Sequence, residues 1–412
     1  MLNRLTIIVL AIACVAGAWA DDHFIIRATV PSAAAELTLI PVSADISIAD
    51  MCAALEIDEL PLDTTLAASE LPLYRGMFPD GRARSLLAQL DRVGEDQARV
   101  HVLLAPEPAG PREIIVYLGD SPDGIPAPEA LPEIEVRQRG ETFDVIGEGF
   151  SVTHDPEKFA GLPSTFGFTD TGKVFDSFVL NDRIYNKGMG GFYPRNDPEP
   201  EVELLGAGPV CVEVQVRARY LSGGGVAPDS NPRATYNFRY YAGSPLVEVS
   251  AEIEQDSAFE WKELHFIEIN FKDDSFTHWA ADDPGNLTEF VGSQKSGSGK
   301  KWGALVDGAS ALGLTGNIKT WDHAEGHGNY LHGPWVGWNA AEARFRAWLW
   351  LGSGEDALQR LAADATAVGV GAPGMALAPQ LARALAELNL LAHGFMIHSD
   401  TRGALDQALP GF

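Results

Sequence analysis

The sequence is short of cysteines, of basic residues and of nucleotide-binding motifs. Three cysteines among 412 residues, with no Cys-x-x-Cys pair, exclude a zinc finger and a disulfide scaffold. The 30 lysines and arginines face 57 aspartates and glutamates, for a formal net charge of -27. So acidic a chain repels phosphates, which excludes nucleic acid and anionic membranes as partners. The glycine clusters at 188–191 and 222–225 lack the strand–helix context and lysine of a phosphate loop.

Beyond residues 1–20, the sequence has no apolar run long enough to cross a membrane. In residues 1–20 an apolar run follows Arg4, and Ala-Trp-Ala at 18–20 precedes two aspartates, which is the pattern of a secretory signal peptide. We therefore expect a secreted or periplasmic protein, with a membrane anchor as the alternative. For Cys52 and Cys211 we expect buried thiols, with a bond between them as the alternative.

Composition divides the rest of the chain. Every lysine lies between Lys158 and Lys319, eight of the nine tryptophans lie between Trp261 and Trp350, and a proline-rich stretch typical of a linker comes before both regions. We predict a signal peptide at 1–20, a small β-domain at 21–120, a proline-rich linker at 121–139, a large β-domain at 140–353 and a helical segment at 354–412.

Strands give the clearest signal in the middle region. Apolar and polar residues alternate over 210–220, 234–241, 246–254 and 344–351. This period is that of a strand with one buried face, and successive long strands joined by short turns predict a large antiparallel pair of sheets. The predicted fold class is mainly β: a small N-terminal β-sandwich, a large antiparallel β-sandwich and a short C-terminal helical segment.

Shorter elements are predicted on both sides of the middle region. In the N-terminal domain we expect strands at 23–30, 35–41, 100–104 and 114–118, and short helices at 51–55 and 84–90. After the large β-domain, apolar residues at helical spacing predict helices at 355–365 and 379–393.

The stretch 261–338 is the richest in residues that carry chemistry, with five of the ten histidines and six tryptophans. Imidazoles exchange protons near neutral pH, and indole rings suit the mixed polar and apolar surface of a sugar. A glycine-rich loop that holds both kinds of residue therefore indicates a glycan site. Its candidates are Trp321, His323, His327, Tyr330, His332, Trp335 and Trp338. The alternative is that the tryptophans belong to the core and the histidines are structural.

Two further patches accompany this loop. Arg183, Tyr185, Lys187 and Arg195 make a basic island in an acidic protein, with an ordinary loop rim as the alternative. On a regular strand Glu263 and His265 share one face while Glu268 lies on the other, so Glu263 and His265 form either a proton relay or a satisfied surface pair.

We predict no cofactor, with a divalent metal as an alternative. His323 and His327 are four residues apart, and Asp322 and His332 lie nearby. Histidines at this spacing share a metal on a helix, but Gly326 and Gly328 make a helix improbable.

Residues 140–353 resemble the large β-sandwich, or supersandwich, of the galactose-mutarotase-like class, which also occurs in several polysaccharide lyases. The residues that carry the resemblance are Gly-Pro-Val-Cys-Val-Glu-Val-Gln-Val at 208–216, Tyr-Asn-Phe-Arg-Tyr-Tyr-Ala-Gly-Ser-Pro-Leu-Val-Glu-Val at 236–249 and Trp-Lys-Glu-Leu-His-Phe at 261–266. Together they resemble the exo-acting rhamnogalacturonan lyase type, and 80–118 is similar to the small β-domain that often precedes such modules. Such enzymes continue into a large helical domain, so 354–412 is expected to be the start of a truncated one.

The resemblance and the histidines together predict a secreted protein that processes a polysaccharide or oligosaccharide, with a lyase as the first hypothesis. β-Elimination on a uronate needs a base, a cation for the carboxylate and an acid for the leaving oxygen. We assign His323 or His327 as the base, Arg183 and Lys187 to the carboxylate, and Tyr330 or Tyr185 as the acid. The expected substrate-binding residues are Trp321, His332, Trp335, Trp338, Glu263, His265 and Arg195.

Other hypotheses remain open at this stage. One is a non-catalytic carbohydrate-binding module or fragment, and another is a sugar epimerase-like protein. A third is a glycoside hydrolase that uses two of Glu263, Glu268, Asp322 and Glu325. The net negative charge repels an acidic polysaccharide, so the lyase hypothesis requires a locally positive cleft built from the lysines and Arg183.

Overall fold

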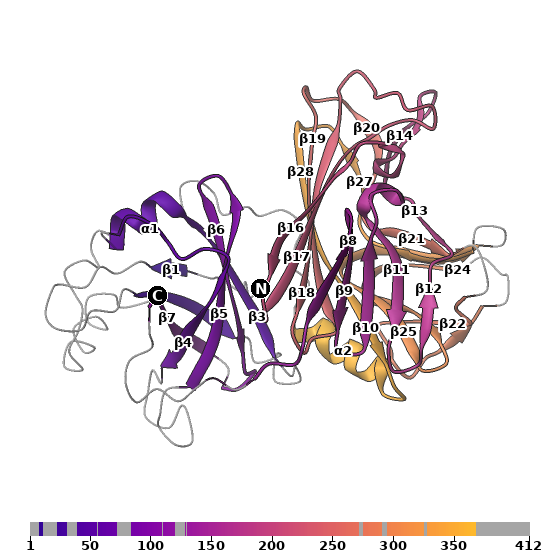
Figure 1. The fold of residues 1–412 in the computed structure, drawn as a ribbon. Helices are drawn as coiled ribbons and strands as arrows, with labels where there is room; N and C mark the ends of the chain where they lie inside the picture. Colours follow the sequence, from indigo (N-terminus) through magenta and orange to yellow (C-terminus); the bar gives the residue numbers. More distant parts are fainter. Residues whose placement is uncertain are drawn as a thin grey trace, which may run out of the picture. The chain divides into compact units, whose positions relative to one another are not determined.

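The structure is a computed structural model that describes residues 8–10, 23–30, 39–55, 57–71, 84–108, 110–119, 128, 130–271, 275–290, 295–324 and 328–367. The chain is mainly β and its strands pair antiparallel, which confirms the predicted fold class. The described elements form two compact units, one from β1 to β7 with α1 and one from β8 to β28 with α2 (Figure 1). None of the described helices is long and apolar enough to cross a membrane.

The first unit is one antiparallel sheet in the order β1-β2-β7-β4-β5-β6-β3. Its elements are β1 Ile8–Leu10, β2 His23–Val30, β3 Ile40–Ser47, α1 Ile48–Leu55, β4 Thr64–Leu71, β5 Arg84–Gly94, β6 Gln97–Leu104 and β7 Gly110–Tyr117. Strand β1 lies in the segment predicted as a signal peptide. Among the described cysteines, Cys52 on α1 is half-buried and Cys211 in the second unit is buried, and no disulfide joins the two.

The helix predicted at 84–90 is wrong, because these residues form the first part of β5. Both neighbours, β4 and β6, hydrogen-bond to this segment, and Ala88 and Leu90 are fully buried. Pairing on both sides outweighs the weak local preference for a helix. Two other predicted elements cannot be compared in full with the structure. Residues 35–38 of the strand predicted at 35–41 and the whole helix predicted at 379–393 lie outside the described residues.

The second unit contains three antiparallel sheets of five, twelve and four strands. The five-stranded sheet has β8 Glu135–Arg139, β9 Thr142–Gly147, β10 Phe150–His154, β11 Pro163–Phe168 and β12 Lys173–Phe175. The twelve-stranded sheet has β13 Phe178–Leu180, β16 Glu201–Ala207, β17 Cys211–Arg219, β18 Arg233–Tyr241, β19 Leu246–Glu254, β21 Glu268–Phe271, β22 His278–Ala281, β23 Thr288–Glu289, β24 Lys295–Asp307, β25 Ser310–Ala324, β26 Gly328–His332 and β28 Glu342–Ser353. The four-stranded sheet has β14 Arg183–Asn186, β15 Gly190–Phe192, β20 Trp261–His265 and β27 Trp335–Trp338.

An aromatic core joins the five-stranded sheet to the large one. Phe150 on β10 stacks near Tyr240 on β18 in the shared buried cluster. His154 spans the two sheets, because its Nε2 lies 2.7 Å from the Tyr240 hydroxyl while its Nδ1 lies 2.8 Å from the Gly161 carbonyl oxygen. Complete burial lowers the pKa of His154 to about 4, so the imidazole is neutral at pH 7.

The long strands lie where alternation predicts them, but β17 is buried on both faces along most of its length. Glu213, on the face expected to be exposed, is fully buried and paired with Arg239 at 3.1 Å. Strand β8 lies within the predicted linker 121–139 and pairs with β9, so the second unit begins before residue 140. Helix α2 Ala357–Ala367 follows β28, near the helix predicted at 355–365.

Candidate functional site

A cleft of about 530 Å³ opens where the four-stranded sheet meets the edge of the large sheet. Apart from Gly191, the residues that line it have polar or aromatic side chains: Asn181, Arg183, Tyr185, Tyr193, Glu263, His265, Glu268, Tyr330, His332 and Trp335. These residues come from three stretches far apart in sequence, 181–193, 263–268 and 330–335. The cleft is therefore a product of sheet pairing rather than of one loop.

Cross-strand register brings the central residues together. Arg183 on β14 is paired with His265 on β20, and His265 is paired with Trp335 on β27. In the large sheet Glu268 on β21 is paired with His332 on β26. Residues directly opposite on neighbouring strands have their Cβ atoms about 5 Å apart, close enough for side chains to touch.

Two tight turns connect the small sheet and the large one, the first between β20 and β21 and the second between β26 and β27, and Asp182 holds the first. Its carboxylate accepts hydrogen bonds from the backbone N–H groups of Ile267 and Glu268, both at 2.9 Å, and from the Tyr236 hydroxyl at 2.8 Å. Ile267 has a φ of 54°, a left-handed conformation that is rare for a β-branched residue and persists only where its surroundings impose it. The bonds that Asp182 accepts from the N–H groups of Ile267 and Glu268 help to hold this conformation.

The second turn contains Gly333. Its N–H donates to the Ile267 carbonyl at 2.8 Å, and a Cβ at this position would lie 2.4 Å from the Phe266 carbonyl oxygen. Only glycine allows the two turns to approach so closely. The contact fixes His332 and Trp335, on either side of the second turn, relative to His265 and Glu268.

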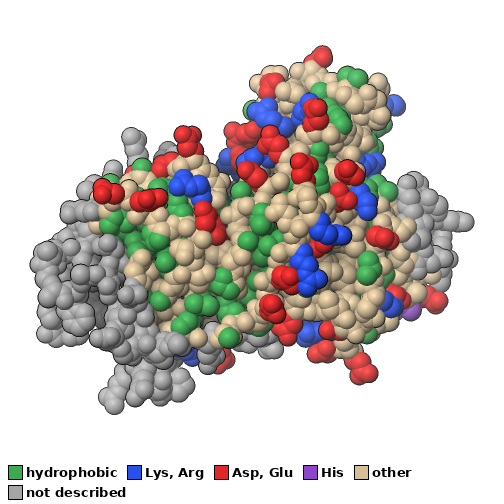
Figure 2. All heavy atoms as spheres, viewed as in Figure 1, with side chains coloured by type: hydrophobic (Ala, Val, Ile, Leu, Met, Phe, Trp, Pro, Cys, Tyr) green, Lys and Arg blue, Asp and Glu red, His purple; other side chains and the backbone are tan. Residues whose placement is uncertain are grey.

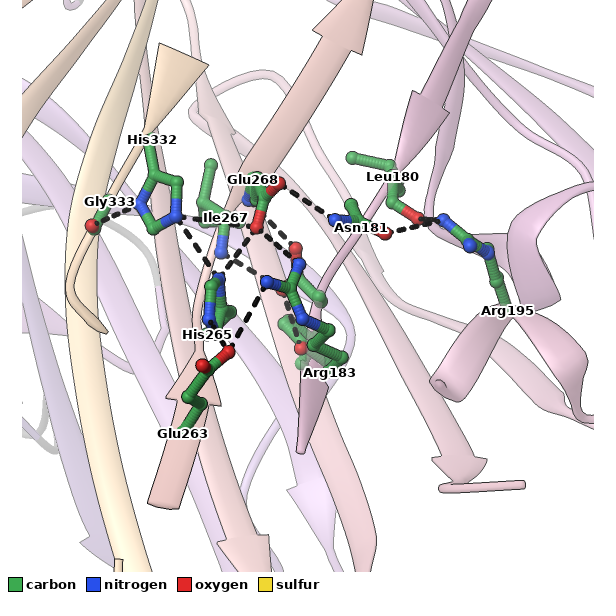
Figure 3. A network of polar contacts seen from close by, with 12 residues as sticks. Leu180, Asn181, Arg183, Arg195, Glu263, His265, Ile267, Glu268, His332 and Gly333 are labelled. Carbon is green, nitrogen blue, oxygen red and sulfur yellow. Dashed lines mark hydrogen bonds and ion pairs between the residues drawn. The ribbon is translucent and has the colours of Figure 1, made fainter. Parts of the chain in front are cut away.

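His265 sits between two carboxylates (Figure 3). Its Nδ1 is 2.6 Å from Glu268 Oε2, and its Nε2 is 3.1 Å from Glu263 Oε2. Arg183 bridges the same two oxygens, donating to Glu268 at 2.9 Å and to Glu263 at 3.3 Å. The other Glu268 oxygen accepts from Asn181 Nδ2 at 2.7 Å. The positions of both carboxylates are thus fixed by several partners.

The pKa values of Glu268 and His332 are shifted in opposite directions. Burial raises the pKa of Glu268, but its contacts with the imidazoles of His265 and His332 and the charges of His332 and Arg183 outweigh that effect, so the pKa lies well below the usual range. Burial lowers the pKa of His332, but the contact with Glu268 and the negative charge of that carboxylate raise the pKa by more, so the net shift is upward. Glu268 is therefore ionised at neutral pH and favours a positive charge beside it.

Three potential metal-ligand atoms converge on the inner side of the network. His265, Glu268 and His332 are all buried and each offers one such atom, the three lying within 4.8 Å of one another. The metal set considered from sequence was His323, His327, His332 and Asp322, and of these only His332 belongs to the described cluster. The side chains of Asp322 and His323 are not described, and His327 lies outside the described residues.

Trp335 gives the cleft an apolar face. Its indole is 44% exposed, and its ring stacks on His265 with centroids 5.3 Å apart and planes 27° apart. The prediction that Trp338 also forms the sugar platform is wrong. Trp338 is 4% exposed and belongs to the core, where it is paired with Trp261. The two tryptophans point to opposite faces of β27 because they are three positions apart on a strand of period two.

The structure places the other candidate residues as follows. Arg183, Tyr185, Glu263, His265, Tyr330 and His332 line the cleft with Trp335. Lys187 is exposed on the turn after β14, and Arg195 lies behind the cleft, stacked 4.3 Å over the ring of Tyr193 and donating to the Leu180 carbonyl at 2.5 Å. Trp321 and His323 lie on β25 with side chains that are not described.

Sequence analysis gave no role to Asn181 or Asp182, and it put Glu268 on the wrong face. Asn181 and Asp182 precede the basic island directly, so their position in the sequence was the available signal. For Glu268 the period-two argument fails because the strand ends at His265 and the chain turns at Ile267. No glycine or asparagine marks that turn.

The locally positive cleft that a lyase requires is not formed by the described residues. Among the described residues, Arg183 is the only lysine or arginine that lines the cleft, and two carboxylates already pair with it. Four described lysines outside the cleft pair with acids in the same way: Lys158 with Asp155, Lys173 with Asp307, Lys262 with Glu260 and Lys300 with Asp282. Figure 2 shows basic side chains interspersed with acidic ones on the visible face of the second unit.

Comparison with known proteins identifies solved structures of similar fold but does not assign the chain to a family. No family model matches the sequence, and no curated protein matches it. The fold is similar to that of an alpha-mannosidase from Enterococcus faecalis, with a TM-score of 0.50 and 13% identity over 89% of this chain and 47% of that one. A glycosyl hydrolase family 38 protein from the same organism has a TM-score of 0.47 and 12% identity over 83% of this chain and 48% of its own. This chain thus spans about half the length of either protein.

Proposed function

We propose that the cleft binds a neutral glycan and that the protein hydrolyses a glycosidic bond there. The observation that carries the proposal is the exposed indole of Trp335, which stands directly beside the Glu263–His265 acid–base pair. An apolar ring face next to a few convergent polar groups suits a sugar ring, with its C–H face and hydroxyl edge.

The charge arrangement supports a neutral substrate over a uronate. A carboxylate that enters the cleft meets Glu263 and Glu268, while Arg183 is held by both of them. Its guanidinium would have to break two ion pairs before it could neutralise a substrate. The β-elimination hypothesis and its rhamnogalacturonan lyase type are therefore less well supported than hydrolysis.

Glu263 is the residue to which we assign proton exchange with the substrate. Its side chain is 25% exposed, whereas that of Glu268 is 4% exposed and ionised. Hydrolysis adds water across the glycosidic bond: the leaving oxygen gains a proton and the anomeric carbon gains a hydroxyl group. The hydroxyls of Tyr185 and Tyr330, which also line the cleft, are placed to contact the substrate.

The likeness to a solved alpha-mannosidase adds support of a general kind, since that protein is named for action on a sugar. Because this chain matches only about half of it, the activity of the whole protein is itself part of the proposal. Secretion, predicted from residues 1–20, agrees with a polymeric glycan as substrate and belongs to the same proposal.

The test is product release from two sets of glycans, neutral and uronate-containing. We expect new reducing ends from a neutral glycan and no unsaturated product from any uronate. Glu263→Gln should abolish the reducing ends, while Glu260→Gln, an exposed acid paired with Lys262 on the same stretch, should leave them unchanged. Unsaturated products, or equal rates in the two variants, would overturn the assignment. Glycan binding without any product would reduce the proposal to a binding module.

A further inference from the structure

The inner side of the polar network holds three atoms that can each donate a lone pair. Glu268 Oε2 lies 2.6 Å from His265 Nδ1 and 3.3 Å from His332 Nε2, and the two ring nitrogens are 3.1 Å apart. Atoms that carry lone pairs repel one another at such distances unless a proton or a cation lies between them. What occupies the centre depends on where the imidazole protons are.

The outer contacts of both imidazoles fix those protons. His332 Nδ1 is 2.8 Å from the Gly333 carbonyl oxygen, which can only accept, so this nitrogen carries a proton. His265 Nε2 is 3.1 Å from the Glu263 carboxylate, which also accepts from Arg183, so this nitrogen carries one too. In their neutral forms both rings therefore turn bare nitrogens, His265 Nδ1 and His332 Nε2, toward the Glu268 carboxylate.

We propose that His265 Nδ1, Glu268 Oε2 and His332 Nε2 bind a divalent transition-metal ion, with zinc as the best fit. Two imidazoles and one carboxylate are the donor set of many open zinc sites. Each histidine also donates its outer N–H to a carbonyl or carboxylate, the arrangement that orients metal-binding imidazoles in proteins. Calcium and magnesium prefer oxygen donors and fit this set poorly.

The distances suit a tetrahedral ion after a small adjustment. Bonds of about 2.0–2.1 Å place tetrahedral ligands about 3.3 Å apart. The pairs that include His332 Nε2 are already at 3.1 and 3.3 Å, and only the 2.6 Å pair must open. The fourth position would be left to water or a sugar hydroxyl, because all three residues line the cleft.

One neighbouring charge opposes the ion. Arg183 Nη1 donates to the same Glu268 oxygen at 2.9 Å, so the arginine and the metal would share it. Glu263 compensates in part, since it places a second negative charge next to both Arg183 and His265.

Zinc titration of the untagged full chain tests the inference by isothermal calorimetry. It requires no glycan and does not depend on the proposed function. We expect one zinc ion per chain that is lost, or weakened more than about 100-fold, in Glu268→Gln and in His332→Gln. The matched control is His278→Ala, which removes a histidine of β22 that bonds only to Thr277 Oγ1 among the described contacts. This variant should bind zinc as the wild type does.

If a variant fails to fold, the visible absorption spectrum of cobalt bound to the wild-type protein tests the metal site instead. Cobalt in a site with two nitrogens and few oxygens gives strong visible bands, whereas six-coordinate cobalt gives weak ones. Strong bands that zinc displaces are expected. Wild-type protein that takes up no zinc, folded Glu268→Gln and His332→Gln that bind it undiminished, or a six-coordinate cobalt spectrum would each overturn the proposal.

Discussion

Trp335 stacks on His265, with ring centroids 5.3 Å apart and planes 27° apart, and leaves 44% of its surface exposed. His265 is itself held between Glu263 and Glu268. One face of the indole is thus positioned by the charged network while the rest remains open to a ligand. The same contact links the aromatic and the acid–base parts of the cleft.

Trp335→Ala should weaken glycan binding with little loss of stability. Loss of an aromatic contact of about 1–1.5 kcal/mol corresponds to roughly tenfold weaker binding. Affinity can be measured by calorimetry with a glycan selected on an array, and stability by thermal unfolding. Phe259→Ala removes another partly exposed ring, 4.9 Å from Trp261 and outside the cleft lining, and should leave the affinity unchanged. Equal affinities in wild type and Trp335→Ala would exclude the platform.

Asp182→Ala should be among the most destabilising single changes in the second unit. It removes the acceptor for two backbone N–H groups and the Tyr236 hydroxyl, all buried. Stranded buried donors cost about 1–3 kcal/mol each, so we expect a loss of about 3–5 kcal/mol. Urea unfolding measures it. Asp256→Ala, which removes an exposed aspartate paired with Arg233, should cost far less. Similar losses of stability in the two variants would contradict the role of Asp182 in holding the turn.

Gly333→Ala should separate the two turns. The new Cβ would lie 2.4 Å from the Phe266 carbonyl oxygen, which belongs to the backbone and cannot rotate away. We expect a loss of about 1–3 kcal/mol and weaker glycan binding, since His332 and Trp335 flank the residue. Gly223→Ala, where nothing lies within 4 Å of the added carbon, is the control and should preserve both properties. Normal binding by Gly333→Ala would show that the close approach is dispensable.

Asp364→Asn should change the pH dependence of stability. Burial raises the pKa of Asp364 to about 6 from 3.8, although the Trp350 indole and Arg360 oppose the shift. A carboxyl with a raised folded pKa stabilises the fold below about pH 3.8, and this stabilisation is lost as the pH rises through about 6. The free energy of unfolding of the wild type relative to Asp364→Asn should thus fall by on the order of 3 kcal/mol from pH 4 to pH 7.

Denaturant unfolding of both proteins across this range checks the sign. His154 acts in the opposite direction, because its folded pKa of about 4 lies below its ordinary 6.5, so acidification below about pH 6.5 destabilises the fold. That effect is common to both proteins and cancels in their difference. A difference that is constant with pH would contradict the buried-carboxyl explanation.

Arg183→Met should strengthen zinc binding if the three ligands are as inferred. The substitution removes a positive charge 2.9 Å from the Glu268 oxygen and keeps much of the side-chain volume. We expect a lower Kd for zinc by calorimetry. Arg217→Met, which removes an exposed arginine paired with Glu201 and Glu203, should not alter it. Weaker binding in Arg183→Met would contradict the inferred competition.

The sequence predicted the mainly β architecture well because long strands with one apolar face have a period that survives folding. The strands over 211–219, 233–241 and 246–254 lie within a residue of their expected bounds. The segment 84–90 failed because its partners β4 and β6, distant in sequence, decide its conformation. Local propensity contains no information on those partners.

The candidate site was predicted in its parts and not in its assembly. The patches around Arg183, Glu263 and Trp335 were all identified from composition, but their meeting depends on the register of β14, β20 and β27. Glu268 was placed on the opposite face because a left-handed isoleucine ends the strand without any sequence signal. Trp338 was taken for a sugar platform because composition cannot distinguish the two faces of a four-residue strand.

The most direct test is a crystal structure of Glu263→Gln with an oligosaccharide that the wild-type protein binds. The account predicts a sugar ring against the exposed face of Trp335, with hydroxyl groups within hydrogen-bonding distance of residue 263 and of Tyr185 or Tyr330. A sugar bound elsewhere on the chain, with the cleft between Arg183 and Trp335 empty, would contradict it.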